Sequence, residues 1–94
     1  MSAGDESEFE RQLAGILAIR LQTLRLAKGL TQWDVADRAG IARNHYQLLE
    51  SGWVNRRTKS PSNPRLSTLV AVSEVLGTIV PELIDEMFAR DSAG

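Results

Sequence analysis

Residues 31–52 limit the possible folds of this chain more than any other stretch, because they have the pattern of two short helices joined by a tight turn. Thr31 can cap the first of these helices, and Asp34 lies where the partner residue of a capping box would be. Gly40 occupies the place where a residue in the left-handed conformation ends a helix. We therefore predict the first helix over about residues 32–38.

The second helix of the pair is predicted over residues 43–51, after Ile41 as an apolar anchor in the turn. Tyr46 and Leu49 are three residues apart, so both can face inward from one side of this helix. Gly52 closes the segment. Two helices joined by a short, glycine-containing turn form a helix-turn-helix arrangement, whose second helix can enter the major groove of DNA.

The length of 94 residues and the hydrophobic content of 43% suit a single domain with one modest core. We place this domain at residues 8–90 and expect flexible ends at residues 1–7, which are acidic, and 91–94. No stretch approaches the ~18 consecutive apolar residues of a membrane span, and an acidic N-terminus is unlike a signal peptide. A soluble, cytoplasmic protein is therefore expected.

The residue types that carry most enzyme and metal chemistry are scarce. The chain has no cysteine, which excludes disulfides and thiolate metal sites. His45 is the single histidine, so most multi-histidine metal sites are excluded and a catalytic triad has almost no support. The acids near it offer no nucleophile–base pair at a useful spacing. We expect no catalytic residue, no metal and no cofactor.

The net charge of −1 hides an uneven distribution of charge along the chain. Residues 1–10 contain four acids and no base, and residues 82–94 have a charge of −3. The intervening residues 11–81 carry ten Lys and Arg against four acids, a charge of +6. A phosphate-contacting face requires basic charge of this kind, although acidic ends that only aid solubility would give the same pattern.

Hydrophobic spacing predicts three further helices, which gives an all-α fold of five helices. The first is long, from about residue 8 to residue 28, with Ser7 and Glu10 as its capping box. The fourth spans about residues 66–76. The fifth begins near Pro81, a favourable residue for a first helical turn.

Between the third and fourth helices lie thirteen residues, 53–65, without hydrophobic periodicity. So long a loop is unusual in a compact helical domain and suggests a functional or mobile segment. It contains Arg56, Arg57, Lys59 and Arg65 and no acid. Solvation alone can explain this composition, and contact with a phosphate backbone is the other interpretation.

Several short motifs occur along the chain in a fixed order. They are Arg25, the tetrapeptide Gly29-Leu30-Thr31-Gln32, Val35-Ala36, Gly40-Ile41, Glu50-x-Gly52, Asn63-Pro64 and Leu76-Gly77. In this order and spacing, over about residues 20–83, the chain resembles the XRE-type (phage repressor or Cro-like) helix-turn-helix family. The resemblance implies a lambda-repressor-like domain that binds double-stranded DNA, with the helix at residues 43–51 in the major groove.

Two features depart from the family pattern. Ten residues separate Gly52 from Asn63, where the family usually has two or three. Ala42 stands where the family usually has a small polar residue, which removes the side-chain cap of the recognition helix. The first departure lengthens the loop after the recognition helix, and the second weakens the start of that helix.

The resemblance implies that Arg43, Asn44 and Leu48 face the bases, and Gln47 is also close enough to reach a base. Arginine can make two hydrogen bonds to guanine and asparagine two to adenine, whereas leucine offers only an apolar contact, for example with a thymine methyl group. Two alternatives stay open. Leu48 can instead pack against Trp53, and Arg43 can instead hold a phosphate.

Further residues are assigned to the DNA backbone. They are Gln32, at the first turn of the first helix of the pair, His45, Arg56, Arg57 and Lys59. An amide beside helix N-terminal N–H groups suits an anion, which agrees with a phosphate contact for Gln32. The resemblance also implies a structural ion pair between Arg25 and Glu50. Trp33 is expected to be half-buried against the long helix at residues 8–28, and contact with a partner subunit is the alternative.

A homodimer on a palindromic operator is expected, because one recognition helix contacts few base pairs. The family resemblance places the dimer interface at Ile79, Val80, Leu83, Met87 and Phe88. Alternatively, these residues complete the core of one subunit, and residues 8–19 of the first helix form the dimer contact.

Taken together, these observations predict a sequence-specific transcriptional regulator of a bacterium or phage. An antitoxin or a protein-interaction module of the same fold, acting through a protein partner such as a toxin or polymerase, is the alternative. The operator, the target genes and the sign of regulation do not follow from the sequence.

Overall fold

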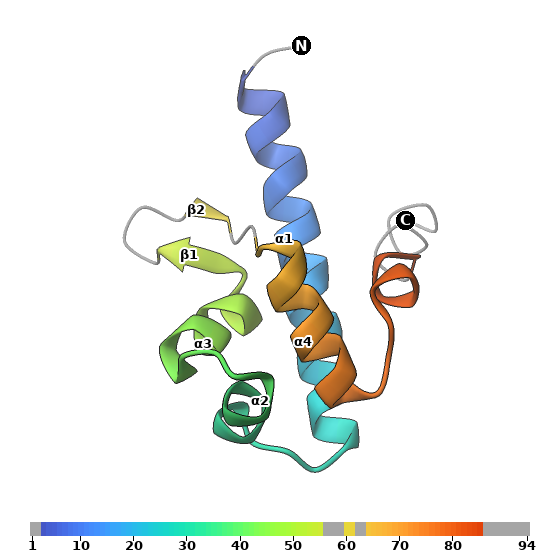
Figure 1. Cartoon of the computed structure of the whole chain (residues 1–94). Helices are drawn as coiled ribbons and strands as arrows, with labels where there is room; N and C mark the ends of the chain where they lie inside the picture. Colours follow the sequence, from blue (N-terminus) through green and yellow to red (C-terminus); the bar gives the residue numbers. More distant parts are fainter. Residues whose placement is uncertain (1–2, 56–59, 62–63, 86–94) are drawn as a thin grey trace.

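A computed structural model describes residues 3–55, 60–61 and 64–85 of the chain. The helices are α1 (Ala3–Ala27), α2 (Gln32–Ala39), α3 (Arg43–Ser51) and α4 (Leu66–Leu76), followed by a helical segment at residues 80–85 (Figure 1). The predicted five-helix, all-α fold is confirmed. The three helices α2, α3 and α4 lie around the C-terminal half of α1 (Figure 1).

Helix α1 is longer than predicted, and its N-terminal part projects beyond the rest of the molecule (Figure 1). It begins at Ala3 instead of near residue 8, so the prediction that Ser7 caps the helix is wrong: this residue lies within it. Residues 8–12 are exposed, and from residue 8 onward Ala14 is the first buried residue. Helix α1 therefore consists of a projecting N-terminal arm, residues 3–12, and a C-terminal part that is packed in the core from Ala14 onward.

The ends of α2 are fixed by its own flanking residues. The Thr31 hydroxyl accepts a hydrogen bond from the Asp34 backbone N–H at 3.0 Å, and the Thr31 N–H donates to the Asp34 carboxylate at 2.9 Å. Gly40 ends the helix in the left-handed conformation, at a φ of 73°. The predicted capping box and glycine stop are both confirmed, and together they set where the turn toward α3 begins.

Helix α3 begins without a side-chain cap, because the side chain of Ala42 has no hydrogen-bonding group. It ends at Gly52, which has a φ of 81° and lies close to the backbone of α1. A Cβ atom at Gly52 would lie 3.6 Å from the carbonyl oxygen of Ala14 and 3.7 Å from the Cα of Gly15, which is ordinary van der Waals contact. The positive φ is thus the reason for glycine here, and the end of α3 rests directly on α1.

The segment expected to be an irregular loop contains a short antiparallel ladder. Strand β1 (Trp53–Asn55) pairs with strand β2 (Ser60–Pro61), with an irregular register. Strand β2 also contacts α1. The sequence did not indicate this pairing, because neither strand is long enough to show an alternating pattern.

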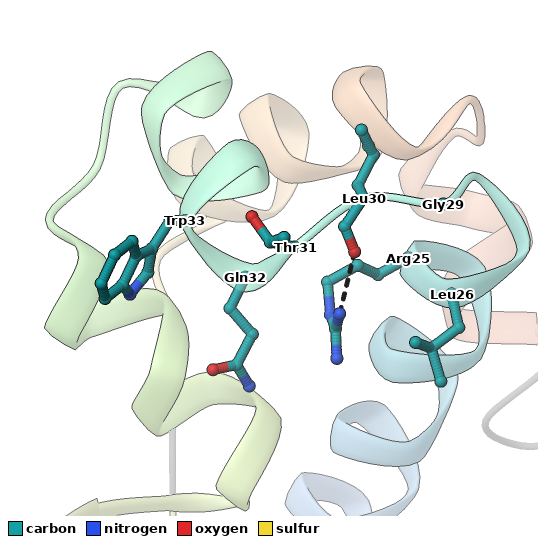
Figure 2. Close-up of a pocket in the computed structure, with 7 residues that line it drawn as sticks. All are labelled: Arg25, Leu26, Gly29, Leu30, Thr31, Gln32 and Trp33. Atoms are coloured by element: carbon teal, nitrogen blue, oxygen red, sulfur yellow. Dashed lines mark hydrogen bonds between the residues drawn. The ribbon is translucent and has the colours of Figure 1, made fainter.

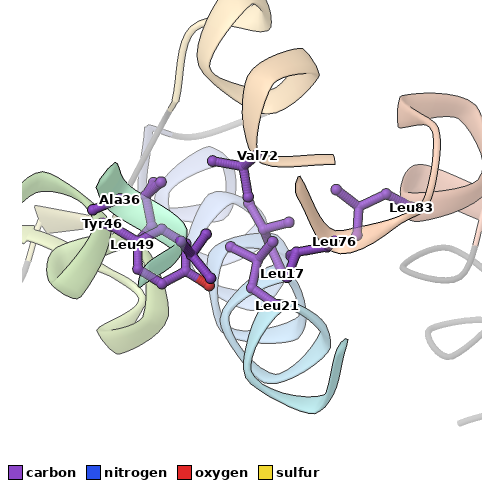
Figure 3. Packing of buried hydrophobic residues seen from close by; sticks show 9 residues of the cluster. Leu17, Leu21, Ala36, Tyr46, Leu49, Val72, Leu76 and Leu83 are labelled. Atoms are coloured by element: carbon purple, nitrogen blue, oxygen red, sulfur yellow. The ribbon is translucent and has the colours of Figure 1, made fainter. Parts of the chain in front are cut away.

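The core is one cluster of side chains supplied by every helix (Figure 3). Its members are Leu17, Leu21, Val35, Ala36, Tyr46, Leu49, Val72, Leu76 and Leu83. Leu21 of α1 and Val35 of α2 have no exposed surface, and neither has Tyr46 of α3. Helix α3 is therefore held in the core by its inner side alone, which leaves its outer side to solvent.

We expect replacement of Thr31 by alanine to lower the free energy of unfolding by about 1 kcal/mol, because it leaves the Asp34 backbone N–H without its acceptor. The hydrogen bond from the Thr31 backbone N–H lowers the pKa of Asp34 below its usual value of 3.8. Ionised Asp34 therefore stabilises the folded protein above about pH 3.8, the usual pKa of an aspartate. This contribution is lost as the pH falls through the lowered pKa of Asp34 in the folded protein. Urea unfolding between pH 2.5 and pH 7 would measure both effects.

Thr23 provides the matched control for this measurement. Its hydroxyl donates to the Ile19 carbonyl within α1 at 2.8 Å and caps no helix end. Replacement of Thr23 by alanine should leave stability nearly unchanged. Equal losses in the two variants would show that the cap of α2 contributes nothing specific.

Candidate nucleic-acid interface

The two sides of α3 differ in burial and in chemistry. Its inner side carries Tyr46 and Leu49, which are 0% and 2% exposed. The residues predicted to face DNA lie elsewhere on the helix: Arg43, Asn44, His45 and Gln47 are exposed, and Leu48 is half-buried. The outer surface of α3 thus presents a guanidinium, two amides and an imidazole, all of which can hydrogen-bond to DNA. The side chain of Trp53, the alternative partner of Leu48, lies outside the described part.

An ion pair fixes the position of α3 relative to α1. Arg25 Nε lies 2.6 Å from Glu50 Oε2, and Arg25 Nη2 donates to Glu50 Oε1 at 3.1 Å. The Arg25 side chain is 11% exposed and that of Glu50 is 3% exposed. The pair implied by the family resemblance is thus present, with two parallel hydrogen bonds and little contact with water.

The same carboxylate also binds the start of α2. Gln32 Nε2 donates to Glu50 Oε1 at 3.1 Å. In addition, Arg25 Nη1 donates to the Leu30 carbonyl at 2.9 Å (Figure 2). The sequence led us to predict a phosphate contact for Gln32, but it did not indicate the hydrogen bond from Gln32 to Glu50. The end of α1, the start of α2 and the end of α3 are therefore joined by one buried network.

The network also determines the charge of the groups around it. The hydrogen bonds that Arg25 donates to the Glu50 carboxylate raise the pKa of Arg25 above its usual value. Burial, and then the Glu50 carboxylate, raise the pKa of the Tyr46 phenol. The Tyr46 hydroxyl has no hydrogen-bond partner among the described residues. Tyr46 accordingly stays neutral, and the charge in this region belongs to the ion pair.

A shallow hollow lies beside this network, at the N-terminus of α2 (Figure 2). It is lined by Arg25, Leu26, Gly29, Leu30, Thr31, Gln32 and Trp33. A helix N-terminus favours negative charge, because its first N–H groups point outward. The position and lining of this hollow are compatible with the phosphate contact predicted for Gln32.

The prediction that Trp33 is half-buried is wrong, because it is 60% exposed. Its side chain is exposed, and the Arg43 guanidinium lies over its ring, 4.7 Å from the ring centroid. Arg43 also donates to Asp37, from Nε at 3.4 Å and from Nη2 at 3.3 Å. Asp37 was not among the predicted site residues. Trp33 and Asp37 are four residues apart and therefore lie on the same face of α2, and this spacing could have indicated that Asp37 belongs to the site.

The chain matches the helix-turn-helix domain family over residues 16–87. It belongs to this family. A solved structure of the clp gene regulator ClgR from Corynebacterium glutamicum is similar in fold, with a TM-score of 0.69 and 20% sequence identity. The similarity covers 86% of this chain and 78% of the ClgR chain. No curated protein sequence matches significantly.

Family membership supports a DNA-binding transcriptional regulator rather than an enzyme. Within the part of the chain that the structure describes, no three His, Asp or Glu side chains gather where they could hold a metal ion. No helix in the described ranges is long and apolar enough to cross a membrane.

The predicted dimer residues of this helix-turn-helix protein that the structure describes differ in burial. Leu83 is 1% exposed and belongs to the core, so the prediction that it lies on a dimer surface is wrong. Ile79 is 57% exposed, and Val80 is half-buried. The remaining two, Met87 and Phe88, lie outside the described residues.

The predicted phosphate contacts are likewise only partly described. Gln32 is half-buried at the start of α2, and His45 is exposed on α3. Arg56, Arg57 and Lys59 lie outside the described residues. Arg65, the other base of the loop, is exposed immediately before α4.

Removal of the Glu50 carboxylate is expected to destabilise this helix-turn-helix protein strongly. Glu50→Ala leaves the largely buried Arg25 without its partner, which typically costs about 3–5 kcal/mol. The free energy of unfolding in urea would measure the loss. Glu74→Ala removes an exposed acid from α4 and is the control, expected to change stability by less than about 0.5 kcal/mol. Similar small effects of both substitutions would contradict a structural role for the ion pair.

Proposed function

We propose that this protein is a sequence-specific, double-stranded-DNA-binding transcriptional regulator that acts as a homodimer on a palindromic operator. The observation that carries the proposal is the division of α3 into a buried side and an outer side of hydrogen-bonding groups. In this reading α3 enters the major groove, while α2 crosses above it. The similarity to a protein described as a gene regulator supports the regulatory role.

The base contacts are assigned to the exposed side of α3. Arg43 and Asn44 are at its first turn, and the N-terminal residues of a recognition helix are those that contact base edges. Gln47 follows Asn44 by three residues, so both can reach the same groove floor. Arg43 suits guanine and Asn44 suits adenine, and Leu48 adds an apolar contact with a thymine methyl group.

The phosphate contacts are assigned to either side of this helix. Gln32 lies in the first turn of α2, where helix N–H groups attract an anion, and His45 is exposed beside the base-contacting residues. Arg56, Arg57 and Lys59 follow α3 in the chain and supply further positive charge. The charge of +6 over residues 11–81 supports this assignment, because phosphate contacts supply most of the affinity for DNA without regard to sequence.

A homodimer brings two recognition helices to half-sites about 34 Å apart. Ile79, in the turn before the last helical segment, is the exposed apolar residue of the predicted dimer surface, and Val80, Met87 and Phe88 are assigned to it as well. The N-terminal arm of α1 is the other candidate, since it projects from the domain and exposes Phe9 to 47%.

The same arm supports a second candidate function. A projecting helix with an exposed aromatic side chain is a surface for a protein partner, as an antitoxin or a protein-interaction module would need. In that function a toxin or polymerase is the partner and DNA is secondary. Neither function needs a cofactor or a membrane, and both belong in the cytoplasm.

Selection from a pool of random duplexes at two salt concentrations would test the function. We expect the native protein to enrich a two-fold symmetric motif. Arg43→Ala/Asn44→Ala should lose this enrichment but keep salt-sensitive binding, because its phosphate contacts are intact. Glu74→Ala, which changes an exposed residue of α4, should enrich the native motif. Failure of the folded native protein to enrich any motif would instead favour the protein-partner function.

The oligomeric state would be measured by sedimentation equilibrium, alone and with the selected duplex. Ile79→Asp should weaken the dimer at least tenfold, since it places a charge in an apolar contact. Leu66→Asp, at a residue of α4 that is 67% exposed, is the matched control and should leave the dimer intact. Loss of the dimer in Phe9→Asp only would move the interface to the arm of α1, and a native monomer bound to the whole palindrome would contradict the homodimer.

A further inference from the structure

The Arg43 side chain is held between two side chains of α2, although it belongs to α3. Asp37 accepts hydrogen bonds from its Nε at 3.4 Å and its Nη2 at 3.3 Å, and the Trp33 ring lies 4.7 Å from the guanidinium carbon. Trp33 and Asp37 are four residues apart, so they lie on the same face of α2 and can hold one side chain together. The guanidinium therefore has a defined place on the surface between the two helices.

The hydrogen bonds to Asp37 occupy one particular edge of the guanidinium. An arginine has five N–H donors, and the two bonds engage the edge formed by Nε and Nη2. The other edge, formed by Nη1 and the second N–H of Nη2, makes none of these bonds. Two parallel donors on that edge are what a bidentate contact with the O6 and N7 atoms of guanine requires.

All three side chains of this cluster are on the surface. The Arg43 and Asp37 side chains are 54% and 58% exposed, and Trp33 is 60% exposed. None of them belongs to the hydrophobic core. An exposed ion pair and an exposed cation–π contact add little to folding stability, so stability does not explain why these residues meet.

We propose that Asp37 and Trp33 are positioning residues that aim the free edge of Arg43 at a single guanine. This inference rests on the proposed function, since it assumes that α3 enters the major groove. The ring limits the guanidinium to one plane, and the carboxylate selects its rotation within that plane. An arginine that is already oriented loses less conformational freedom on binding, which favours the matching base over all others.

The charge of Asp37 gives this role a distinctive signature. A carboxylate near DNA repels phosphates, so its removal raises the affinity for any duplex or leaves it unchanged. Its removal also frees Arg43 to swing toward a phosphate. A positioning role therefore predicts that specificity and non-specific affinity change in opposite directions, which neither partial unfolding nor simple loss of a contact produces.

The test uses the full chain and the operator duplex found by selection, together with duplexes in which each guanine is replaced in turn. Fluorescence anisotropy gives the affinity for each duplex. We expect Asp37→Ala to reduce the preference for guanine at one position in each half-site about fivefold, the lower end of what a bidentate contact supplies. Affinity for an unrelated duplex should stay the same or rise. Glu74→Ala, which also removes an exposed acid, should change neither the guanine preference nor the affinity for the unrelated duplex.

Trp33 is tested by two substitutions with different expected results. Trp33→Ala should lose the same guanine preference as Asp37→Ala, whereas Trp33→Phe keeps a ring under the guanidinium and should retain most of it. Solvent exchange of the Arg43 Nε proton, measured by NMR without DNA, should be faster in Asp37→Ala than in the native protein.

The outcomes separate this inference from the proposed function. If the native protein enriches no motif, the proposed function itself fails. If it enriches a motif but Asp37→Ala and Trp33→Ala keep the native guanine preference, the positioning role is overturned. If Arg43→Ala lowers the affinity for all duplexes equally, Arg43 contacts a phosphate, and the positioning role is also overturned.

Discussion

The buried pair between Arg25 and Glu50 is the interaction on which the rest of the structure depends. Taking two charges out of water is costly, and the cost is offset here only because both oxygens of the carboxylate are used. The three hydrogen bonds to Glu50 come from the end of α1 and the start of α2, while Glu50 itself is near the end of α3. A single side chain therefore joins three helices and fixes the position of α3 relative to α1 and α2.

The second constraint is the long helix α1, which carries the core along one half and leaves the other half free. Its buried residues from Ala14 onward contact α3 and α4, and the end of α3 rests on its backbone at Gly52. Helix α3, which carries the predicted base-contacting residues, is thus fixed to a single long helix. The cluster of Trp33, Asp37 and Arg43 then adds order to a side chain that backbone packing alone would leave free to move.

Features set by local interactions were predictable from the sequence. The bounds of α2 follow from Thr31 and Gly40, because a cap and a left-handed stop involve only neighbouring residues. Features that depend on distant contacts were missed: the pairing of β1 with β2 lacks any alternating pattern, and Trp33 meets Arg43 only across the turn between two helices. Leu83 was misplaced for a similar reason, since its spacing alone does not tell a core contact from a dimer contact. The start of α1 was also wrong, because a possible cap at Ser7 does not stop a helix that is able to continue.

Helix α3 is anchored in the core through Tyr46 and Leu49 alone. Apart from the buried Glu50 side chain, its other positions are partly or fully exposed, so a substitution there leaves the hydrophobic cluster as it is. The residues of this nine-residue helix that support folding, which include Glu50, are therefore different from those that carry the proposed recognition of DNA. Such a separation lets a lineage change what the helix recognises by single substitutions, without passing through an unfolded intermediate.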